Sequence, residues 1–363
     1  MPPPKPKPPP GPSPFDVSPA YTTPGLVCAH HHLYSALARG MPAPPRTPRG
    51  FGEILELIWW RLDRALDLDL IHWSAMLGAL ECLEVGCTAV IDHHESPNAI
   101  EGSLSVIADA CAAVGVRASC AYGVTDRHGA DGARRGLAEN ERYLRAGGEG
   151  YVGIHAAFTC TDETLEAAAG LAADLGVGVH THVAEGPVDA PAAERLAALS
   201  RPDWLLIHGV HLPDRHGLAG TVVHNPRSNM NNAVGYARPA RFANNPVALG
   251  TDGIGSDMLD EFRLAYVRLR ESDVTASPEI PWQWLSAGWD LMPEARNDTV
   301  TWNYAAMEPW HLAFSPGVRP ERVEVAGEVV WADGRPTRVD AAEIRAKAAE
   351  AARRLFRRLD ELD

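Results

Sequence analysis

The strongest constraint on the fold is an alternation of short apolar runs with longer amphipathic segments along most of the chain. Five of the amphipathic segments repeat apolar residues at helical spacing and predict helices over residues 53–66, 72–86, 103–114, 162–175 and 192–199. Several end at a glycine, the usual residue after a helix. Strands that are buried on both faces and alternate with helices form parallel sheets. Eight such runs predict an α/β fold, a (β/α)8 TIM-like barrel, with a doubly wound open sheet as the alternative. The runs are residues 25–30, 88–94, 116–124, 152–159, 177–184, 204–209, 221–226 and 247–252.

The two ends of the 363-residue chain differ in character from its middle. Nine prolines among the first fourteen positions predict that residues 1–23 form a solvated tail. We expect the barrel to occupy residues 24–296. Residues 297–363 are expected to hold a small, partial β-sandwich appendage, with a hairpin turning at 326–327, and a helix over 341–362.

The composition restricts the kinds of molecule that the protein is expected to bind. The net charge of −14 argues against nucleic acids and anionic membranes, because both would repel the chain. No apolar run approaches the ~20 residues of a membrane helix, and no signal-peptide pattern is visible. The six cysteines form no C-x-x-C pair. We therefore expect a cytoplasmic protein that acts on a small molecule. A homodimer is the default for symmetric soluble enzymes, and the sequence leaves the oligomeric state open.

Candidate metal ligands follow the apolar runs at their carboxyl ends, where barrel enzymes place their chemistry. His30 and His32 lie two residues apart on the first run, so both face the same way while His31 faces the other. A single histidine at such a position is usually a packed core residue. The joint pattern predicts a metal site, and imidazole with carboxylate suits Zn²⁺ or Fe²⁺. The candidate residues are His30, His32, His182, Glu185, His208 and Asp252.

The same segments resemble the amidohydrolase superfamily over about residues 24–275. The opening sequence PGLVCAHHHL at 24–33 is similar to the first motif of that family, and HVAE, HGVH and LGTDG match later motifs. Finer features, including WWRLD at 59–63 and VIDHH at 90–94, resemble the SsnA-type aminohydrolases. That branch is chlorohydrolase-like and is related to guanine and cytosine deaminases.

The resemblance implies roles for the strand-end residues. His30, His32, His182 and Asp252 would be the ligands, with His208 at the metal or bonded to its water. Glu185 would shuttle protons, Asp252 would take the proton of the water, and His208 would polarise the substrate. The implied reaction is hydrolytic deamination of an aminated purine, pyrimidine or triazine-like ring by water that the metal activates. The alternatives are dechlorination or amidine hydrolysis at the same site, and a non-catalytic metal-binding remnant.

The lysines bear on the number of metal ions. Two-metal members of the family commonly bridge their ions with a carbamylated lysine on the fourth strand. The only lysines of this chain are Lys5, Lys7 and Lys347, so the barrel segment has none. We expect one divalent ion, Zn²⁺ in preference to Fe²⁺.

Four further residues are candidates for substrate binding. Asn229, just past the seventh run, either shapes its loop or binds substrate. Arg227 either clamps an anion or is a solvated surface residue, and His94 either reaches the site or stabilises its loop. Trp60 either packs in the core or forms a wall against which a substrate ring stacks. Relatives usually carry sandwich strands ahead of the opening motif, where this chain has its proline-rich segment, so we expect an incomplete sandwich.

Overall fold

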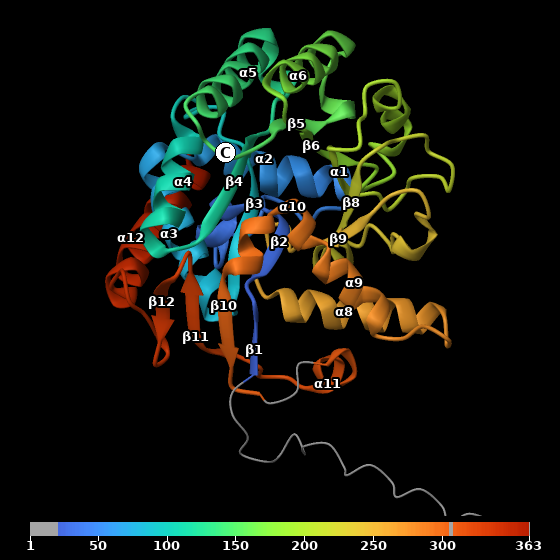
Figure 1. Cartoon of the computed structure of the whole chain (residues 1–363). Coiled ribbons are helices and arrows are strands. Elements are labelled where there is room, and N and C mark those ends of the chain that lie inside the picture. The colour runs from blue at the N-terminus through green and yellow to red at the C-terminus, as the bar shows by residue number, and fades with distance from the viewer. Residues whose placement is uncertain (1–20, 305–307, 363) are drawn as a thin grey trace, which may run out of the picture.

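The computed structural model describes residues 21–304 and 308–362 (Figure 1). The predicted tail over residues 1–23 lies outside the described residues except for its last three positions. These positions and Pro24 form strand β1 (Tyr21–Pro24), so described secondary structure begins before the expected boundary at residue 24.

Each of the eight predicted runs contains one strand, and every strand pairing among them is parallel. Nearly all residues of these strands are buried, as expected when both faces are covered. They form two sheets, with strand orders β2-β3-β4 and β5-β6-β7-β8-β9. Their bounds are β2 (Leu26–His31), β3 (Cys87–His94), β4 (Arg117–Tyr122), β5 (Val152–Ala156), β6 (Val179–Val183), β7 (Leu205–His208), β8 (Thr221–His224) and β9 (Val247–Leu249).

Isolated parallel bridges connect the two sheets at both of their gaps. Val124, just past β4, pairs with Ile154 of β5. On the other side, His31 of β2 pairs with Asp252, just past β9. Because all the strands are parallel, their carboxyl ends open toward the same side of the molecule. Residues that follow different strands are thereby brought together.

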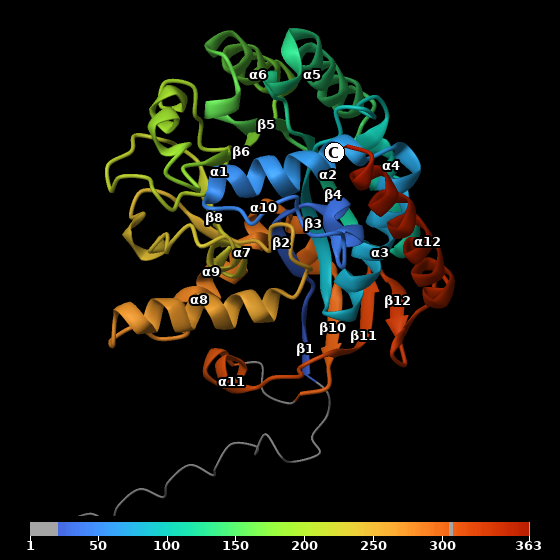
Figure 2. The same ribbon diagram turned by 180° about the vertical axis from the view of Figure 1, so that it is seen from behind.

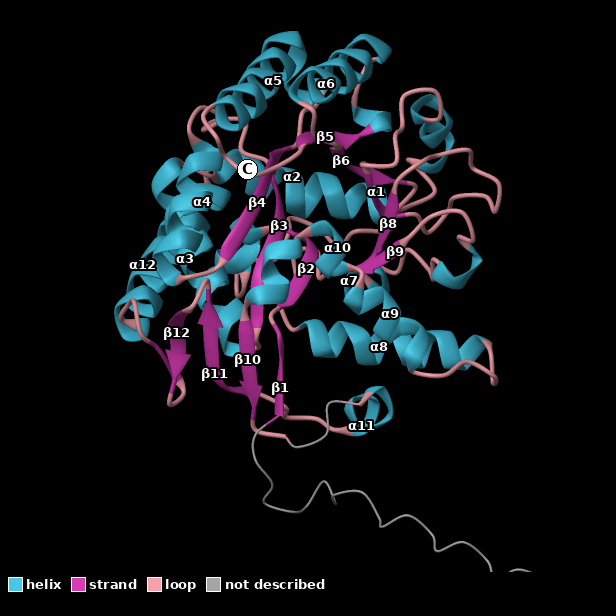
Figure 3. Cartoon of the chain, viewed as in Figure 1, coloured by secondary structure: helices cyan, strands magenta, loops and turns pink. Residues whose placement is uncertain are grey.

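Helices lie outside the parallel strands in both orientations of the molecule (Figures 1 and 2), and Figure 3 distinguishes the two kinds of element by colour. The predicted helices 103–114 and 162–175 end at Gly115 and Gly176, whose φ angles of +104° and +67° favour glycine. The charge-rich helices α5 and α8 are not among the predicted segments. The helix bounds are α1 (Phe51–Ile54), α2 (Trp60–Ala65), α3 (Leu68–Glu84), α4 (Ser103–Val114), α5 (Gly129–Arg145), α6 (Asp162–Leu175), α7 (Pro226–Asn231), α8 (Met258–Ser272), α9 (Glu279–Ser286), α10 (Gly288–Leu291), α11 (Pro309–Phe314) and α12 (Ala341–Asp360).

Shorter helical segments lie between these elements: a π-helix, η2 (Leu55–Trp59), joins α1 to α2, and 3₁₀ turns occupy several loops. The turn η3 (Asp126–His128) follows β4, and η5 (Ala190–Leu196) falls where a helix over 192–199 is expected from the sequence. Within the described residues, we find no helix with an apolar stretch long enough to cross a bilayer.

A five-stranded antiparallel sheet forms the predicted β appendage. Its strand order is β1-β10-β11-β12-β13, so one strand comes from the segment before β2 and four from the end of the chain. Trp302 is fully buried and donates its indole N–H to Thr23 across the β1–β10 pair. The hairpin turn falls at Ala326 and Gly327, as expected. The bounds are β10 (Thr299–Trp302), β11 (Pro320–Val325), β12 (Glu328–Ala332) and β13 (Arg335–Pro336).

The predicted C-terminal helix, α12, packs along α3 and α2, beside β11 and β12 (Figure 2). Its buried stripe recurs at helical spacing and includes Ile344, Leu355 and Leu359. Because β1 runs directly into β2, the antiparallel sheet adjoins the amino ends of the parallel strands. The carboxyl ends remain open for a site.

Candidate metal centre and active site

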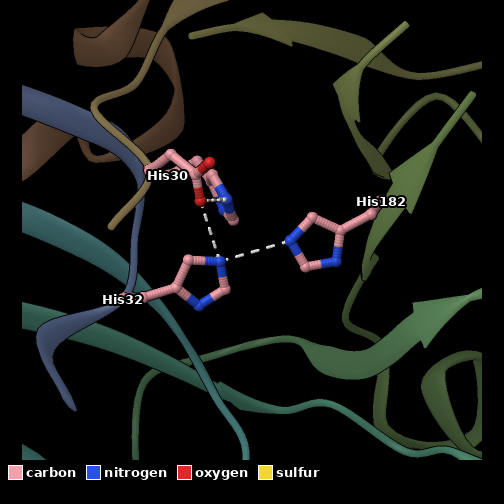
Figure 4. A group of neighbouring side chains, drawn as sticks. His30, His32 and His182 are labelled. Carbon is pink, nitrogen blue, oxygen red and sulfur yellow. Dashed lines mark hydrogen bonds and ion pairs between the residues drawn. The ribbon is translucent and has the colours of Figure 1, made fainter. Parts of the chain in front are cut away.

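Three histidines and one aspartate meet at the carboxyl ends of the parallel strands. His30 lies in β2, His32 follows it, His182 lies in β6, and Asp252 follows β9. One ligand atom of each lies within 4.8 Å of the others. The imidazoles of His30, His32 and His182 converge on one point (Figure 4). The predicted ligand residues are thus brought together, although they come from segments far apart in the chain.

The shortest contacts of the cluster involve His32 and Asp252. His32 Nε2 lies 3.0 Å from Asp252 Oδ1, and His30 Nε2 lies 3.3 Å from the same oxygen. His182 Nε2 lies 3.3 Å from His32 Nε2. Four donor atoms at these separations match the imidazole and carboxylate set that divalent transition metals prefer.

Hydrogen bonds orient the ligand imidazoles. His32 Nδ1 donates to the carbonyl of His93 at 2.6 Å, and His182 Nδ1 donates to the carbonyl of His155 at 2.7 Å. With the proton on Nδ1, the lone pair on each Nε2 is directed at the shared point. His30 Nδ1 lies 2.9 Å from His180 Nε2, which gives the third ring a comparable partner. Such outer hydrogen bonds are typical of metal-ligating histidines.

The electrostatics of the cluster also favour a cation. Burial lowers the pKa of His182 to about 3, so its ring is neutral, as a ligand must be. Burial also opposes a charge on His32, but contacts with Asp252 outweigh it and raise the pKa of His32 to about 9. The added proton occupies the same Nε2 position that an ion would take, beside Asp252, so a positive charge is favoured at this point. The residues fit a divalent metal ion, which supplies that charge.

His208 and Glu185 stand beside the cluster. His208 Nε2 lies 3.4 Å from Glu185 Oε2 and 3.9 Å from Asp252 Oδ2. Its Nδ1 donates to Asn229 Oδ1 at 2.8 Å, which directs the lone pair of Nε2 toward the two carboxylates. This Nε2 is buried without a hydrogen-bond partner in the described part of the chain. An unpaired nitrogen there is free to contact a substrate or a ligand.

The two carboxyl groups of the site have opposite pKa shifts. Burial, with Asp252 and Asp189 nearby, raises the pKa of Glu185 well above its usual value. Burial acts on Asp252 in the same direction, but its contacts with His30 and His32 hold its pKa well below the usual range. The shifts favour the protonated form of Glu185 and the ionised form of Asp252.

Further hydrogen bonds fix both carboxyl groups. Ser228 Oγ donates to Asp252 Oδ2, and Asn232 Nδ2 donates to Glu185 Oε1 at 3.4 Å. Asp189 accepts the backbone N–H of Glu185 at 2.9 Å and that of the next residue at 2.8 Å. Each carboxyl group is thus held in one orientation by neighbouring side chains.

The backbone at the strand ends is strained. His208 and Asp252 have φ angles of +74° and +55°, and Ala184, just before Glu185, has a φ of +48°. Residues with a side chain rarely adopt this region, and the cost is of order 1–3 kcal/mol each. The strain falls on the residues that carry the predicted chemistry, so the fold holds them there against local preference.

A cavity leads from the cluster of three histidines and Asp252 past aromatic side chains. The cluster contributes His32, His182 and Asp252 to its wall. Trp60 also lines the cavity, as expected if its ring forms a wall against which a substrate ring stacks. Aromatic residues of this kind suit a flat ring. The remaining lining residues are Tyr34, Phe51, Leu55, Trp59, Asp63, His93, Glu95, His155, Ala156, Phe158, Glu185, Asp189, Asn232 and Gly253.

The other three substrate-binding candidates lie elsewhere in the described structure and do not line this cavity. Asn229 holds His208, as described above. His94 is fully buried and bonds to Ser96 Oγ at 2.8 Å, a loop-stabilising contact. Arg227 is 26% exposed at its side chain and forms an ion pair with the buried Glu261 at 2.8 Å.

Several cavity residues escaped the sequence analysis. Glu95 follows β3 and His155 lies in β5, so the strand-end rule could have found both. Asp63 and Tyr34 lie on helical segments, where the strand-end rule does not apply. Asp63 closes the WWRLD segment that is part of the family resemblance, but the resemblance implies no role for Asp63. Of the three lysines, only Lys347 lies in the described residues, and it is on α12, outside the cavity lining.

A buried cluster of three histidines and an aspartate lies beside a carboxyl group whose pKa is raised, an arrangement that suits a metal-dependent hydrolase. The chain matches the amidohydrolase family profile over residues 21–280. It belongs to the amidohydrolase family, which confirms the resemblance inferred from its motifs.

Individual relatives fit this assignment. The chain is 28% identical to a 5'-deoxyadenosine deaminase from Methanopyrus kandleri, over 92% of this chain and 86% of that protein. It is 30% identical to an 8-oxoguanine deaminase from Pseudomonas aeruginosa, over 76% and 70%. Among solved structures, a zinc-bound adenosine deaminase from Xanthomonas campestris has a TM-score of 0.79 at 21% identity, covering 93% and 86%. A triazine hydrolase variant has a TM-score of 0.77 at 21% identity, covering 91% and 87%.

Proposed function

We propose that this protein is an aminohydrolase that removes the exocyclic amino group of an aminated heterocycle by hydrolysis. The observation that carries the proposal is geometric: Asp252 contacts His30 and His32, and Glu185 lies 3.4 Å from His208 beside the same cluster. The opposite pKa shifts of the two carboxyl groups support it. The aromatic cavity beside them suits a planar ring. The two curated relatives described above are named as deaminases of purine compounds.

The proposed architecture is a (β/α)8 barrel over residues 24–296. The bridges at both gaps between the sheets and the likeness to amidohydrolase structures support it. We assign the antiparallel sheet and α12 to an appendage over residues 297–363, to which β1 contributes a strand from before the barrel.

We assign one Zn²⁺ to His30, His32, His182 and Asp252, with His208 close enough to join them or to bond to the ion's water. When bound, the ion supplies a water molecule whose pKa is lowered toward about 7. Asp252 accepts the proton that this water loses. Glu185 donates its proton to a ring nitrogen, and His208 Nε2 orients the reacting group. Glu185 then takes the second proton of the added water and delivers it to the amino group, so that the carbon–nitrogen bond breaks and ammonia leaves. The oxygen stays on the ring, and the proton held by Asp252 passes back to Glu185.

The proposal is tested by measuring bound metal and ammonia release over a panel of aminopurines, aminopyrimidines, aminotriazines and amidines. Chlorinated analogues of the same rings are assayed in parallel for chloride release. We expect zinc-loaded protein to release ammonia from at least one aminated ring. If it releases only chloride, the activity is dechlorination. If it binds metal and turns over no member of the panel, the protein is a metal-binding remnant.

A further inference from the structure

A group of aromatic side chains lies on the surface of α8 and α11, outside the cavity lining. Trp310 is 46% exposed and Phe314 is 66% exposed, although both side chains are large and apolar. Their rings are nearly parallel with centres 6.3 Å apart, and each meets the buried Tyr266 edge-on at 6.1 Å. Val267, which follows Tyr266 on α8, is 45% exposed. We call these four residues the aromatic patch.

Hydrogen bonds hold the two helices of the aromatic patch together. Arg263 of α8 donates from Nε to the carbonyl of Leu312 and from Nη2 to the carbonyl of Ser315, each at 3.0 Å. Ser315 Oγ donates in turn to Tyr304 Oη at 2.9 Å, which ties the end of α11 to the segment after β10. The rings are therefore presented to water by a fixed support. Contiguous apolar surface of this kind commonly marks an interaction site.

The N-terminal segment joins the described structure near the aromatic patch. Tyr21, the first residue of β1, pairs with Trp302 of β10, and Trp302 lies two residues before Tyr304, which contacts the end of α11. Figures 1 and 2 show the start of β1 and α11 at the same end of the molecule. Residues 11–20 can span up to about 33 Å when extended. The residues before them can therefore reach the patch.

The composition of this N-terminal segment suits an aromatic surface. Nine of its first fourteen residues are prolines, and Phe15 follows them. Proline-rich chains favour the polyproline II helix, which docks on surfaces lined by aromatic rings and loses little conformational entropy in doing so. The exposed rings of Trp310 and Phe314 provide such a surface. Local composition alone predicts a solvated tail, because it does not show that a matching surface lies nearby.

The charges match as well. The segment contains Lys5 and Lys7, two of the three lysines of a chain whose net charge is −14. Acidic residues border the aromatic patch: Glu308 directly precedes α11, and Glu271 lies four residues after Val267 on α8, so both stand beside the exposed side chains. A basic, proline-rich segment thus complements an acidic, aromatic surface.

We propose that residues 2–15 dock on the aromatic patch of their own chain as a polyproline II segment. Proline rings pack against Trp310 and Phe314, and the lysines lie near the acidic residues that border the patch. Because the segment is tethered beside the patch, its effective concentration there is of the order of millimolar, which favours it over a partner in dilute solution. The docked segment covers apolar surface that would otherwise face water. This interaction is independent of the proposed reaction.

The first test measures how often the segment is undocked in the full chain. Chymotrypsin cleaves after Phe15 only from the undocked form, and mass spectrometry follows the release of residues 1–15. Phe314→Ser should speed this cleavage by at least about fivefold, because the undocked population rises. Replacing Pro8, Pro9 and Pro10 together by serine should have the same effect with the patch intact. Leu68→Ser, which removes an exposed apolar side chain of α3, is the control and should leave the rate unchanged.

The second test locates the segment by carbodiimide cross-linking, which joins lysines to carboxyl groups in contact with them. Lys347, on α12, is the only lysine outside the segment. We expect Lys5 or Lys7 to link to Glu271 or Glu308 in the parent, with a yield that does not change on dilution, and to lose these links in Phe314→Ser.

Three outcomes overturn the proposal. The first is an equal rate of cleavage after Phe15 in the parent, in Phe314→Ser and in the triple proline variant, with circular dichroism showing that all three fold. The second is a set of links spread over the surface, or links whose yield falls on dilution because they join two chains. The third is seen by light scattering: if Phe314→Ser converts a dimer into a monomer without changing the cleavage rate, the patch is a contact between copies.

Discussion

At the scale of single residues, the site depends on which ring nitrogen of each histidine is hydrogen-bonded to the rest of the protein. His32, His182 and His208 each use Nδ1 to bond to a neighbouring carbonyl or amide oxygen, so each presents Nε2 to the centre of the site. The carboxyl groups are also hydrogen-bonded: Asp252 accepts from Ser228, and Glu185 accepts from Asn232. The site is organised before any ligand arrives, which is what a hydrolase needs for a low reorganisation cost.

Substitution of Glu185 should remove turnover alone, whereas substitution of His182 should remove both bound metal and turnover. Glu185→Gln keeps the shape of the side chain but cannot carry the proton, so kcat should fall by roughly 10²–10⁴-fold with metal content unchanged. His182→Ala removes a ligand and should lose metal as well as turnover. Elemental analysis and ammonia release are measured for both variants and the parent. Full activity of Glu185→Gln contradicts the proton-shuttle role, and metal loss in that variant would make Glu185 a ligand.

Asp92 should make stability depend on pH. Burial raises its pKa to about 7, although the backbone N–H of Leu33, which its Oδ1 accepts at 2.6 Å, acts in the other direction. The folded state therefore holds a proton that the unfolded state has lost above about pH 4. The stability that this proton gives is complete below about pH 4 and is lost as the pH rises through about 7.

Asp92→Asn keeps the acceptor for Leu33 and removes the ionisation. Its free energy of unfolding, relative to the parent, should rise between pH 4 and 8. Urea denaturation of metal-stripped protein across that range measures the difference, since metal binding would add its own pH dependence. The exposed Asp109→Asn on α4 is the control, and its difference from the parent should be flat. A flat difference for Asp92→Asn would show that this carboxyl group is ionised in the folded state.

At the scale of elements, one short helix serves three functional groups. Within or just after α7, Ser228 bonds to Asp252, Asn229 to His208 and Asn232 to Glu185. Residues four apart on a helix share a face, so Ser228 and Asn232 lie together, and Asn232 Nδ2 also approaches Ser228 Oγ at 3.4 Å. The arrangement links strands β6, β7 and β9 through a single turn of helix, which explains why the two carboxyl groups keep a fixed relation.

The contact between the antiparallel sheet and the barrel can be tested at a glycine. Gly86, before β3, has a φ of +74°, and a Cβ added there would lie 2.4 Å from the buried ring of Trp302. Gly102 has a similar φ of +84° but open space around it. Gly102→Ala should cost about 1 kcal/mol from backbone strain alone. Gly86→Ala should cost about 1–3 kcal/mol more, because the ring must move.

Urea unfolding of both variants measures these costs on one scale. The two variants share the strain of a left-handed alanine, so the difference between them reports the packing of Trp302 against the barrel. Equal destabilisation of the two would mean that the antiparallel sheet moves away from the barrel without cost.

At the scale of the whole molecule, the chain joins two parallel sheets so that β2, β6, β7 and β9 end at one place. His30 and Asp252 are 222 residues apart in the sequence, and His32 and His182 are 150 apart. The antiparallel sheet and α12 lie away from these strand ends. They contribute to the buried core without entering the site.

This arrangement predicts about one tightly bound divalent ion per chain, because a single cluster offers three imidazoles and a carboxylate. Elemental analysis of purified protein should give that ratio, and His30→Ala should reduce it strongly. Glu185, His208 and Asp252 also lie close enough to share an ion. A reproducible second ion lost in His208→Ala but retained in His30→Ala would place it there and contradict the one-metal assignment.

Much of the architecture is determined by local sequence. The eight apolar runs fix the strands because burial on both faces leaves few polar positions, and glycines end α4 and α6 where the sequence places them. The ligand histidines are identifiable because residues two apart on a strand must share a face. The polar residues at the ends of the runs also have to lie near one another, because the carboxyl ends of parallel strands all lie on the same side.

The tertiary structure alone decided what lies between those strand ends. Asp63 lies on α2, and only the approach of Arg127 and Glu95 from two other loops brings the three charged side chains together beside the cavity. Arg227 pairs with Glu261, and β1 joins β10, through contacts that no local periodicity encodes. Hydrophobic periodicity reports which face of an element is buried. Which loops then meet depends on closing long stretches of chain, and that choice is made by packing of the whole fold.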